Sequence, residues 1–100
     1  MASFENEIKM VIRTGKLEIG SQSTIKTLKH GKSKMVVIAS NADPSVKKDI
    51  EYYAKLSQTP IYVFQGTSVE LGTLLGKPFP IQALSIIDVG DSKILELVET

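Results

Sequence analysis

The sequence predicts an α/β fold, a three-layer α/β/α sandwich with a small mixed, mostly four-stranded sheet. Segments with apolar residues at helical spacing alternate with short β-branched runs along the whole chain. One of these runs, residues 35–39, is apolar at every position, which is typical of a central strand covered on both faces. The 100 residues, 1–100, suit one domain, and no change of composition marks a linker.

The first part of the chain is predicted to form a helix, a short strand and a second helix. The first helix covers residues 4–13 and has apolar side chains at helical spacing: Phe4, Ile8, Val11 and Ile12. Gly15 ends it, and residues 17–19 alternate as a short strand. The second helix begins at Ser21 or Gln22 and ends at Gly31.

The buried strand at 35–39 leads into a third predicted helix. Asp43 is suited to its N-cap and Pro44 to its first helical position. The helix runs to about residue 58, and we expect it to bury its apolar side chains: Val46, Ile50, Tyr53, Ala54 and Leu56. Residues 61–64 then form the next strand.

The remaining elements begin at a capping box. Residues 67–70 read Thr-Ser-Val-Glu, in which the threonine hydroxyl and the glutamate satisfy each other's backbone donors. A short helix follows to Gly76, and a loop covers residues 77–80. Residues 83–88 form a further strand, and residues 93–97 are predicted to pair as a last one.

Charge is distributed unevenly along the chain. The formal net charge is only +1, yet residues 1–50 hold nine Lys/Arg against five Asp/Glu, whereas residues 51–100 hold three against six. Between residues 9 and 34 there are seven basic residues and one acid, Glu18. This local excess suggests a positive face that could bind a polyanion. Lysines that merely solubilise the surface would give the same count.

Several classes of function find little support. Without cysteine there is no disulfide, thiolate catalysis or cysteine metal site, and the single histidine, His30, suits a helix end. No paired carboxylates suggest acid–base catalysis, and residues 72–77 lack the spacing and the Ser/Thr of a phosphate loop. We therefore expect no enzyme, no metal and no cofactor. Neither a signal peptide nor a membrane-length apolar run is visible, so we expect no membrane partner.

The segment from Gly20 to Lys26 is the strongest candidate binding element. It reads Gly-Ser-Gln-Ser-Thr-Ile-Lys, a glycine turn that opens directly onto a helix. Free N–H groups and the dipole at a helix N-terminus favour an anion. The candidate residues here and in the basic run that follows are Gly20, Ser21, Gln22, Ser23, Thr24, Lys26, Lys29 and Lys32.

Two other residues are candidates for the same surface. Asn41 follows the predicted central strand, and the carboxyl end of such a strand often carries ligands, although asparagine also suits a plain turn before proline. Phe79 lies between two prolines, where its ring could stack on a base or fold back on the core. We expect residues 20–24, 40–41 and 78–80 to converge on one edge of the sandwich.

The chain resembles a known family over essentially its whole length. The residues that carry the resemblance are Thr14-Gly15-Lys16, Gly20 to Lys26, His30-Gly31-Lys32, Val36 to Asn41, Asp49 to Ala54 and Gly66 to Lys77. They resemble the archaeal and eukaryotic large-subunit ribosomal protein L-thirty-e family, within the L-seven-Ae superfamily of kink-turn RNA binders. The match favours an archaeal member, and the segment from Gly66 to Lys77 is the part that distinguishes this branch.

The resemblance implies binding to a kink-turn, an internal loop at which an RNA helix bends sharply. Gln22, Ser23 and Lys26 would touch the kink, Asn41 would contact a base, and Phe79 would stack on an extruded base. Lys29 and Lys32 would hold phosphates. The wider superfamily often has Asn-Glu where this chain has Gln22-Ser23, so the glutamate that accepts a bond from guanine is absent here.

The resemblance therefore implies a non-catalytic protein of the large ribosomal subunit that binds a kink-turn of ribosomal RNA. Its other partners would be ribosomal proteins, its location the cytoplasm, and its free form a monomer. One alternative is a kink-turn binder of another ribonucleoprotein particle, which the segment from Gly66 to Lys77 argues against. A small nucleotide-binding enzyme domain is the alternative of a different class, and it lacks the motifs.

Overall fold

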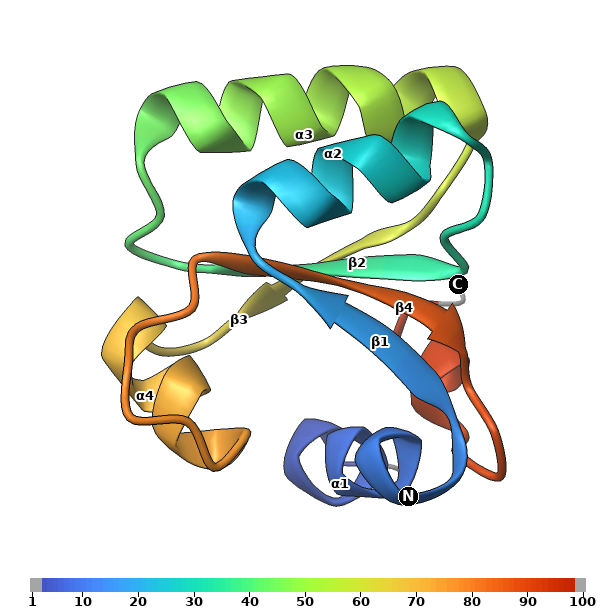
Figure 1. Cartoon of the computed structure of the whole chain (residues 1–100), viewed down its shortest axis with the longest axis vertical. Coiled ribbons are helices and arrows are strands. Elements are labelled where there is room, and N and C mark those ends of the chain that lie inside the picture. Colours follow the sequence, from blue (N-terminus) through green and yellow to red (C-terminus); the bar gives the residue numbers. More distant parts are fainter. Residues whose placement is uncertain (1–2, 99–100) are drawn as a thin grey trace.

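A computed structural model describes residues 3–98 and contains a four-stranded mixed sheet. Its strands are β1 (Lys16–Ile19), β2 (Met35–Ala39), β3 (Ile61–Phe64) and β4 (Ala83–Asp88). They lie in the order β1-β4-β2-β3 (Figure 1). β2 and β3 are parallel, while β4 runs antiparallel to both β1 and β2. The predicted mixed four-stranded sheet is confirmed.

Helices cover both faces of this sheet, as Figure 1 shows. α2 (Ser21–Lys29) and α3 (Pro44–Ser57) lie on one face. α1 (Phe4–Thr14), α4 (Ser68–Leu74) and the short 3₁₀ helix η1 (Ile94–Leu97) lie on the other. The three-layer α/β/α sandwich is therefore also confirmed.

The core consists of two apolar layers that meet at β2. Met35, Val37 and Ala39 pack toward α1 and α4, whereas Val36 and Ile38 pack toward α2 and α3. All five residues are buried, as expected for a central strand. The alternation follows from the two-residue period of a strand, which sends successive side chains to opposite faces.

The expected last strand at residues 93–97 is wrong, because this segment forms η1. The Ser92 hydroxyl donates to the carbonyl of Glu7 (3.0 Å) and accepts from the N–H of Ile94 (3.0 Å). The Glu7 carboxylate accepts from the N–H of Lys93 (2.7 Å). These contacts turn the chain onto α1 and bury Ile94 there, away from both edges of the sheet.

The α3 helix begins as predicted. The Asp43 carboxylate accepts hydrogen bonds from the hydroxyl and the N–H of Ser45, at 2.8 and 2.9 Å, and Pro44 is the first helical residue. The Ser45 hydroxyl, and then its N–H, hold the pKa of Asp43 below its ordinary value of 3.8. The ionised Asp43 cap therefore stabilises the fold at pH values above the ordinary pKa of the carboxyl group. This stabilisation is lost as the pH falls through the lowered pKa of the folded protein.

Leu56 does not join the core, contrary to expectation: it is 66% exposed, whereas Ile50 on the same helix is fully buried. We expect Leu56→Ser to change the free energy of unfolding by less than about 0.5 kcal/mol, because the side chain has little apolar contact to lose. Ile50→Val should cost roughly 0.5–1.5 kcal/mol. Urea denaturation measures both, and a loss at Leu56 equal to that at Ile50 would contradict this burial.

Candidate nucleic-acid interface

Three predicted binding segments meet at one end of the sheet. β4 runs antiparallel to its neighbours, so its first residues lie beside the last residues of β1 and β2: Leu84 pairs with Ile19, and Ala83 with Ile38. The chain enters α2 after β1, turns toward α3 after β2, and enters β4 from the loop after α4 (Figure 1). Gly20, Asn41 and Phe79 lie in these three connections.

Hydrogen bonds between the three connections fix their arrangement. The N–H of Gly20 donates to the carbonyl of Ala83 (3.0 Å), and the N–H of Ala39 donates to the carbonyl of Gln82 (2.8 Å). The N–H of Ile81 donates to the carbonyl of Ser68 (2.9 Å), which joins the loop to the start of α4. Residues 81–83 thus tie the turns after β1 and β2 to α4, at the end of the sheet to which residues 20–24, 40–41 and 78–80 connect.

The first turn of α2 differs from those of the other α-helices in residues 3–98. Side-chain oxygens of Ser3, Asp43 and Thr67 cap α1, α3 and α4. The N-cap of α2 is Gly20, at φ +112°, and no side chain caps this helix. A glycine adopts this backbone conformation without strain, and its missing side chain leaves the first N–H groups open to a ligand.

Thr24 is placed differently from the other candidates in this segment. Its side chain is fully buried, and its hydroxyl donates to the carbonyl of Gly20 (2.7 Å). The expectation that Thr24 contacts a ligand is therefore wrong for its side chain. Its hydroxyl instead reinforces the turn that presents Ser21, Gln22 and Ser23 at the helix start.

The Asn41 side chain is oriented by one hydrogen bond. Its Oδ1 accepts from the N–H of Ser68, the first residue of α4, at 2.7 Å. Within residues 3–98 its Nδ2 has no hydrogen-bond partner, and the residue is exposed. Because the oxygen is held by α4, the two N–H donors of the amide are left for a ligand.

Gln82 is a candidate that the sequence analysis missed. Its Oε1 accepts from the N–H of Asp43 at 2.9 Å, and the residue is exposed, so its amide donors are also available at this edge. The arrangement repeats that of Asn41. A glutamine directly before a strand carries no sequence signal for such a role, and the pairing with Asp43 joins residues 39 positions apart.

Phe79 is 49% exposed, so its ring does not fold back into the core. The loop that carries it lies against α4 at Gly72, where an added Cβ would approach the carbonyl oxygen of Phe79 to 2.1 Å. Only glycine allows this close approach of the loop to the helix. Gly72 is buried in α4, so residues 72–74 are helical.

The predicted basic residues are divided between two places. A groove of about 270 Å³ between β1 and α2 is lined by Ser23, Lys26 and Lys32, together with Lys16 and His30. Lys29 instead faces α3, with its Nζ 5.0 Å from the centre of the Tyr53 ring. Both lysines lie in the last turn of α2, but Lys26 shares the groove with Ser23 of the first turn, whereas Lys29 packs toward α3.

Among residues 3–98 no group of three or more histidine or acidic side chains could hold a metal ion. Over the same range no helix has the length and hydropathy needed to span a membrane. What the edge does offer is a set of donors, an exposed ring and lysines.

Comparison with known proteins decides the family. Residues 2–96 match the model of the ribosomal protein L7Ae/L30e/S12e/Gadd45 family. The chain belongs to this family. The resemblance drawn from the sequence is thereby confirmed, and the match spans all three connections of the edge.

Several archaeal relatives within the family are similar over nearly their full length. The large ribosomal subunit protein eL30 of Methanothermobacter thermautotrophicus is 56% identical over 91% of this chain and 93% of its own. Proteins of the same name from Sulfurisphaera tokodaii and Methanocaldococcus jannaschii are 48% and 50% identical, over 99% and 92% of this chain. The matched regions make up 93% and 84% of the lengths of those two relatives.

Proposed function

We propose that this chain is a structural protein of the large ribosomal subunit that binds a kink-turn of ribosomal RNA. The names of its relatives support the ribosomal assignment. The observation that carries the binding proposal is the meeting of the uncapped α2 start, the Asn41 amide and the exposed Phe79 ring at one edge. The protein acts without catalysis, in the cytoplasm, as a monomer before it joins its ribosomal neighbours.

Each element of the edge suits one feature of a bent RNA. The open N–H groups at Ser21 to Ser23 can receive a phosphate, and Lys26 adds charge beside them. The donors of Asn41 and Gln82 can reach acceptors on base edges. The ring of Phe79 offers a stacking platform for an unpaired base. Recognition by shape, stacking and phosphates is how proteins read irregular RNA.

The ribosomal assignment is tested by crosslinking in cells and identification of the bound RNA. We expect the crosslinks to fall on large-subunit ribosomal RNA, at a sharply bent internal loop. Crosslinks on a guide or other small RNA would instead assign the chain to another ribonucleoprotein particle.

Lys26 should contribute one phosphate contact. We expect Lys26→Ala to weaken kink-turn binding and to reduce the slope of log affinity against log salt by about one unit, because one fewer counterion is released. Titrations over a range of salt concentrations measure this slope. Lys55→Ala, on the exposed surface of α3, is the matched control and should leave the slope unchanged.

A further inference from the structure

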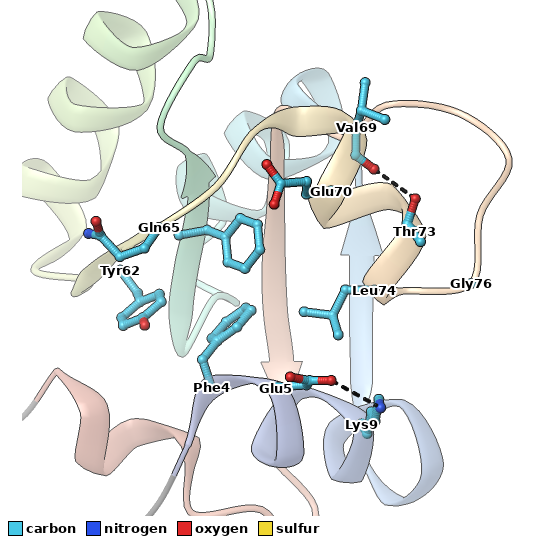
Figure 2. A pocket seen from close by; sticks show the side chains of 11 residues that line it. Phe4, Glu5, Lys9, Tyr62, Gln65, Val69, Glu70, Thr73, Leu74 and Gly76 are labelled. Atoms are coloured by element: carbon cyan, nitrogen blue, oxygen red, sulfur yellow. Dashed lines mark hydrogen bonds and ion pairs between the residues drawn. The ribbon is translucent and has the colours of Figure 1, made fainter.

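A second concave surface lies on the other face of the sheet from α2. It is a groove of about 720 Å³ between α1 and α4, floored by β3 (Figure 2). α1 contributes Phe4, Glu5 and Lys9, and β3 contributes Tyr62 and Phe64. The α4 side is formed by Val69, Glu70, Thr73 and Leu74, with Gly76 just after the helix. None of the residues predicted to bind RNA lines this groove.

The floor of the groove is aromatic and apolar. The ring of Phe4 stacks on that of Tyr62, with centroids 4.8 Å apart and planes 8° apart, and lies 5.4 Å from that of Phe64. Leu74 points into the groove from α4 (Figure 2). Val69, near the start of α4, also lines the groove and is 62% exposed. Such a surface favours apolar anchors from a partner.

The rim carries an excess of negative charge. Of the residues that the structure describes, Glu5, Glu70 and a single cation, Lys9, line it; Lys9 pairs with Glu5 at 3.5 Å, and the Glu70 carboxylate accepts from the N–H of Thr67 at 3.2 Å. Neutral polar groups are used internally: the Thr73 hydroxyl donates to the carbonyl of Val69 at 3.0 Å. Carboxylates repel RNA phosphates and attract lysine or arginine, whose cations also bind ring faces.

The backbone of β3 is open along one side. Among residues 3–98, β3 is the last strand of the sheet and pairs only with β2, over Ile61–Phe64. Its outer N–H and C=O groups form an edge to which an extended peptide can add as a further strand. Side chains from alternate positions of such a peptide would reach the groove, since β3 itself directs Tyr62 and Phe64 there.

We propose that this groove is a docking site for an extended segment of another protein, rich in basic residues and anchored by apolar ones. The segment pairs with the free edge of β3, places apolar side chains against Phe4, Tyr62 and Leu74, and directs its cations to Glu5 and Glu70. The protein then holds RNA with one edge and a protein neighbour with a separate surface.

The probe is a nine-residue peptide with lysine and valine in turn at its odd positions and threonine at its even positions, so that both lysine and valine face the groove; it is compared with the same peptide carrying glutamate in place of lysine. We expect the full-length protein to bind the lysine peptide more tightly, with amide NMR shifts along β3. Glu5→Lys and Val69→Lys should each weaken binding roughly fivefold or more. The matched controls Glu51→Lys and Leu56→Lys, on exposed positions of α3, should leave it unchanged.

Affinity for a kink-turn RNA distinguishes this groove from the edge that carries Gly20, Asn41 and Phe79. We expect this affinity to be equal in Glu5→Lys and Glu51→Lys, whether or not the proposed RNA function is correct. Equal binding of the two peptides would overturn the proposal. So would displacement of the lysine peptide by RNA, or self-association of the chain that Val69→Lys abolishes in sedimentation experiments.

Discussion

Asn41→Asp is expected to weaken binding to a kink-turn RNA by about 1.5–3 kcal/mol, roughly 10- to 150-fold, without loss of stability. The new carboxylate can still accept from the N–H of Ser68, as Oδ1 of Asn41 does at 2.7 Å, and a negative charge suits the start of α4. The substitution removes the two amide donors and places a charge where RNA would lie. Calorimetric titration and urea denaturation measure the two quantities separately.

The control for this variant is Asn6→Asp, which makes the same change of charge at an exposed position of α1. It should retain wild-type affinity for the RNA. If Asn41→Asp binds as tightly as Asn6→Asp, the donors of Asn41 are not used, and the residue serves only to hold the start of α4.

Phe79→Ala is expected to cost roughly 1–3 kcal/mol of kink-turn affinity, because a stacked base loses its aromatic partner. The ring is 49% exposed, so its removal should change the free energy of unfolding little. The loop itself should keep its place, since it is fixed by the close approach of its backbone to Gly72 and by the bond from Ile81 to Ser68. Gel-shift titration gives the affinity.

Tyr52→Ala provides the matched loss of an exposed aromatic ring. Tyr52 is 61% exposed on α3, where its ring meets that of Tyr53, and it lies outside the RNA edge. We expect this variant to bind RNA like the wild type. An unchanged dissociation constant for Phe79→Ala would remove the ring from the binding surface.

Much of the fold could be predicted because its signals are local. The apolar run at 35–39 is long enough to identify a strand buried on both faces, and it is the centre of both apolar layers. Asp43-Pro44 marks the start of α3, and the capping box of Thr67 and Glu70 marks that of α4. Such signals depend on residues within one turn of each other.

The errors arose where distant residues decide the structure. Alternating apolar residues near the end of the chain looked like a strand, but Ser92 and Glu7, which are 85 positions apart, turn them into η1. Leu56 has core chemistry, yet its position on α3 leaves it in solvent. No local pattern separates these cases from true strand or core residues.

The candidate site was predictable in its three segments but not in the orientation of its side chains. Gly20 is identified from its turn, Asn41 from its place after a strand and Phe79 from its place between two prolines; all three lie in connections at one end of the sheet. The burial of Thr24, the direction of Lys29 toward Tyr53 and the amide of Gln82 depend on contacts across the fold. These contacts separate binding side chains from those that hold the edge in shape.

Recognition of a bent RNA is the central claim, and one comparison tests it most directly. The wild-type protein is titrated with a kink-turn RNA and with an unbent duplex of the same length and composition, at one salt concentration. Tighter binding to the kink-turn, by a factor of about ten or more, is expected because the unbent duplex offers phosphates but no extruded base. Equal affinity for the two RNAs would show that only charge is recognised and would contradict the proposed function.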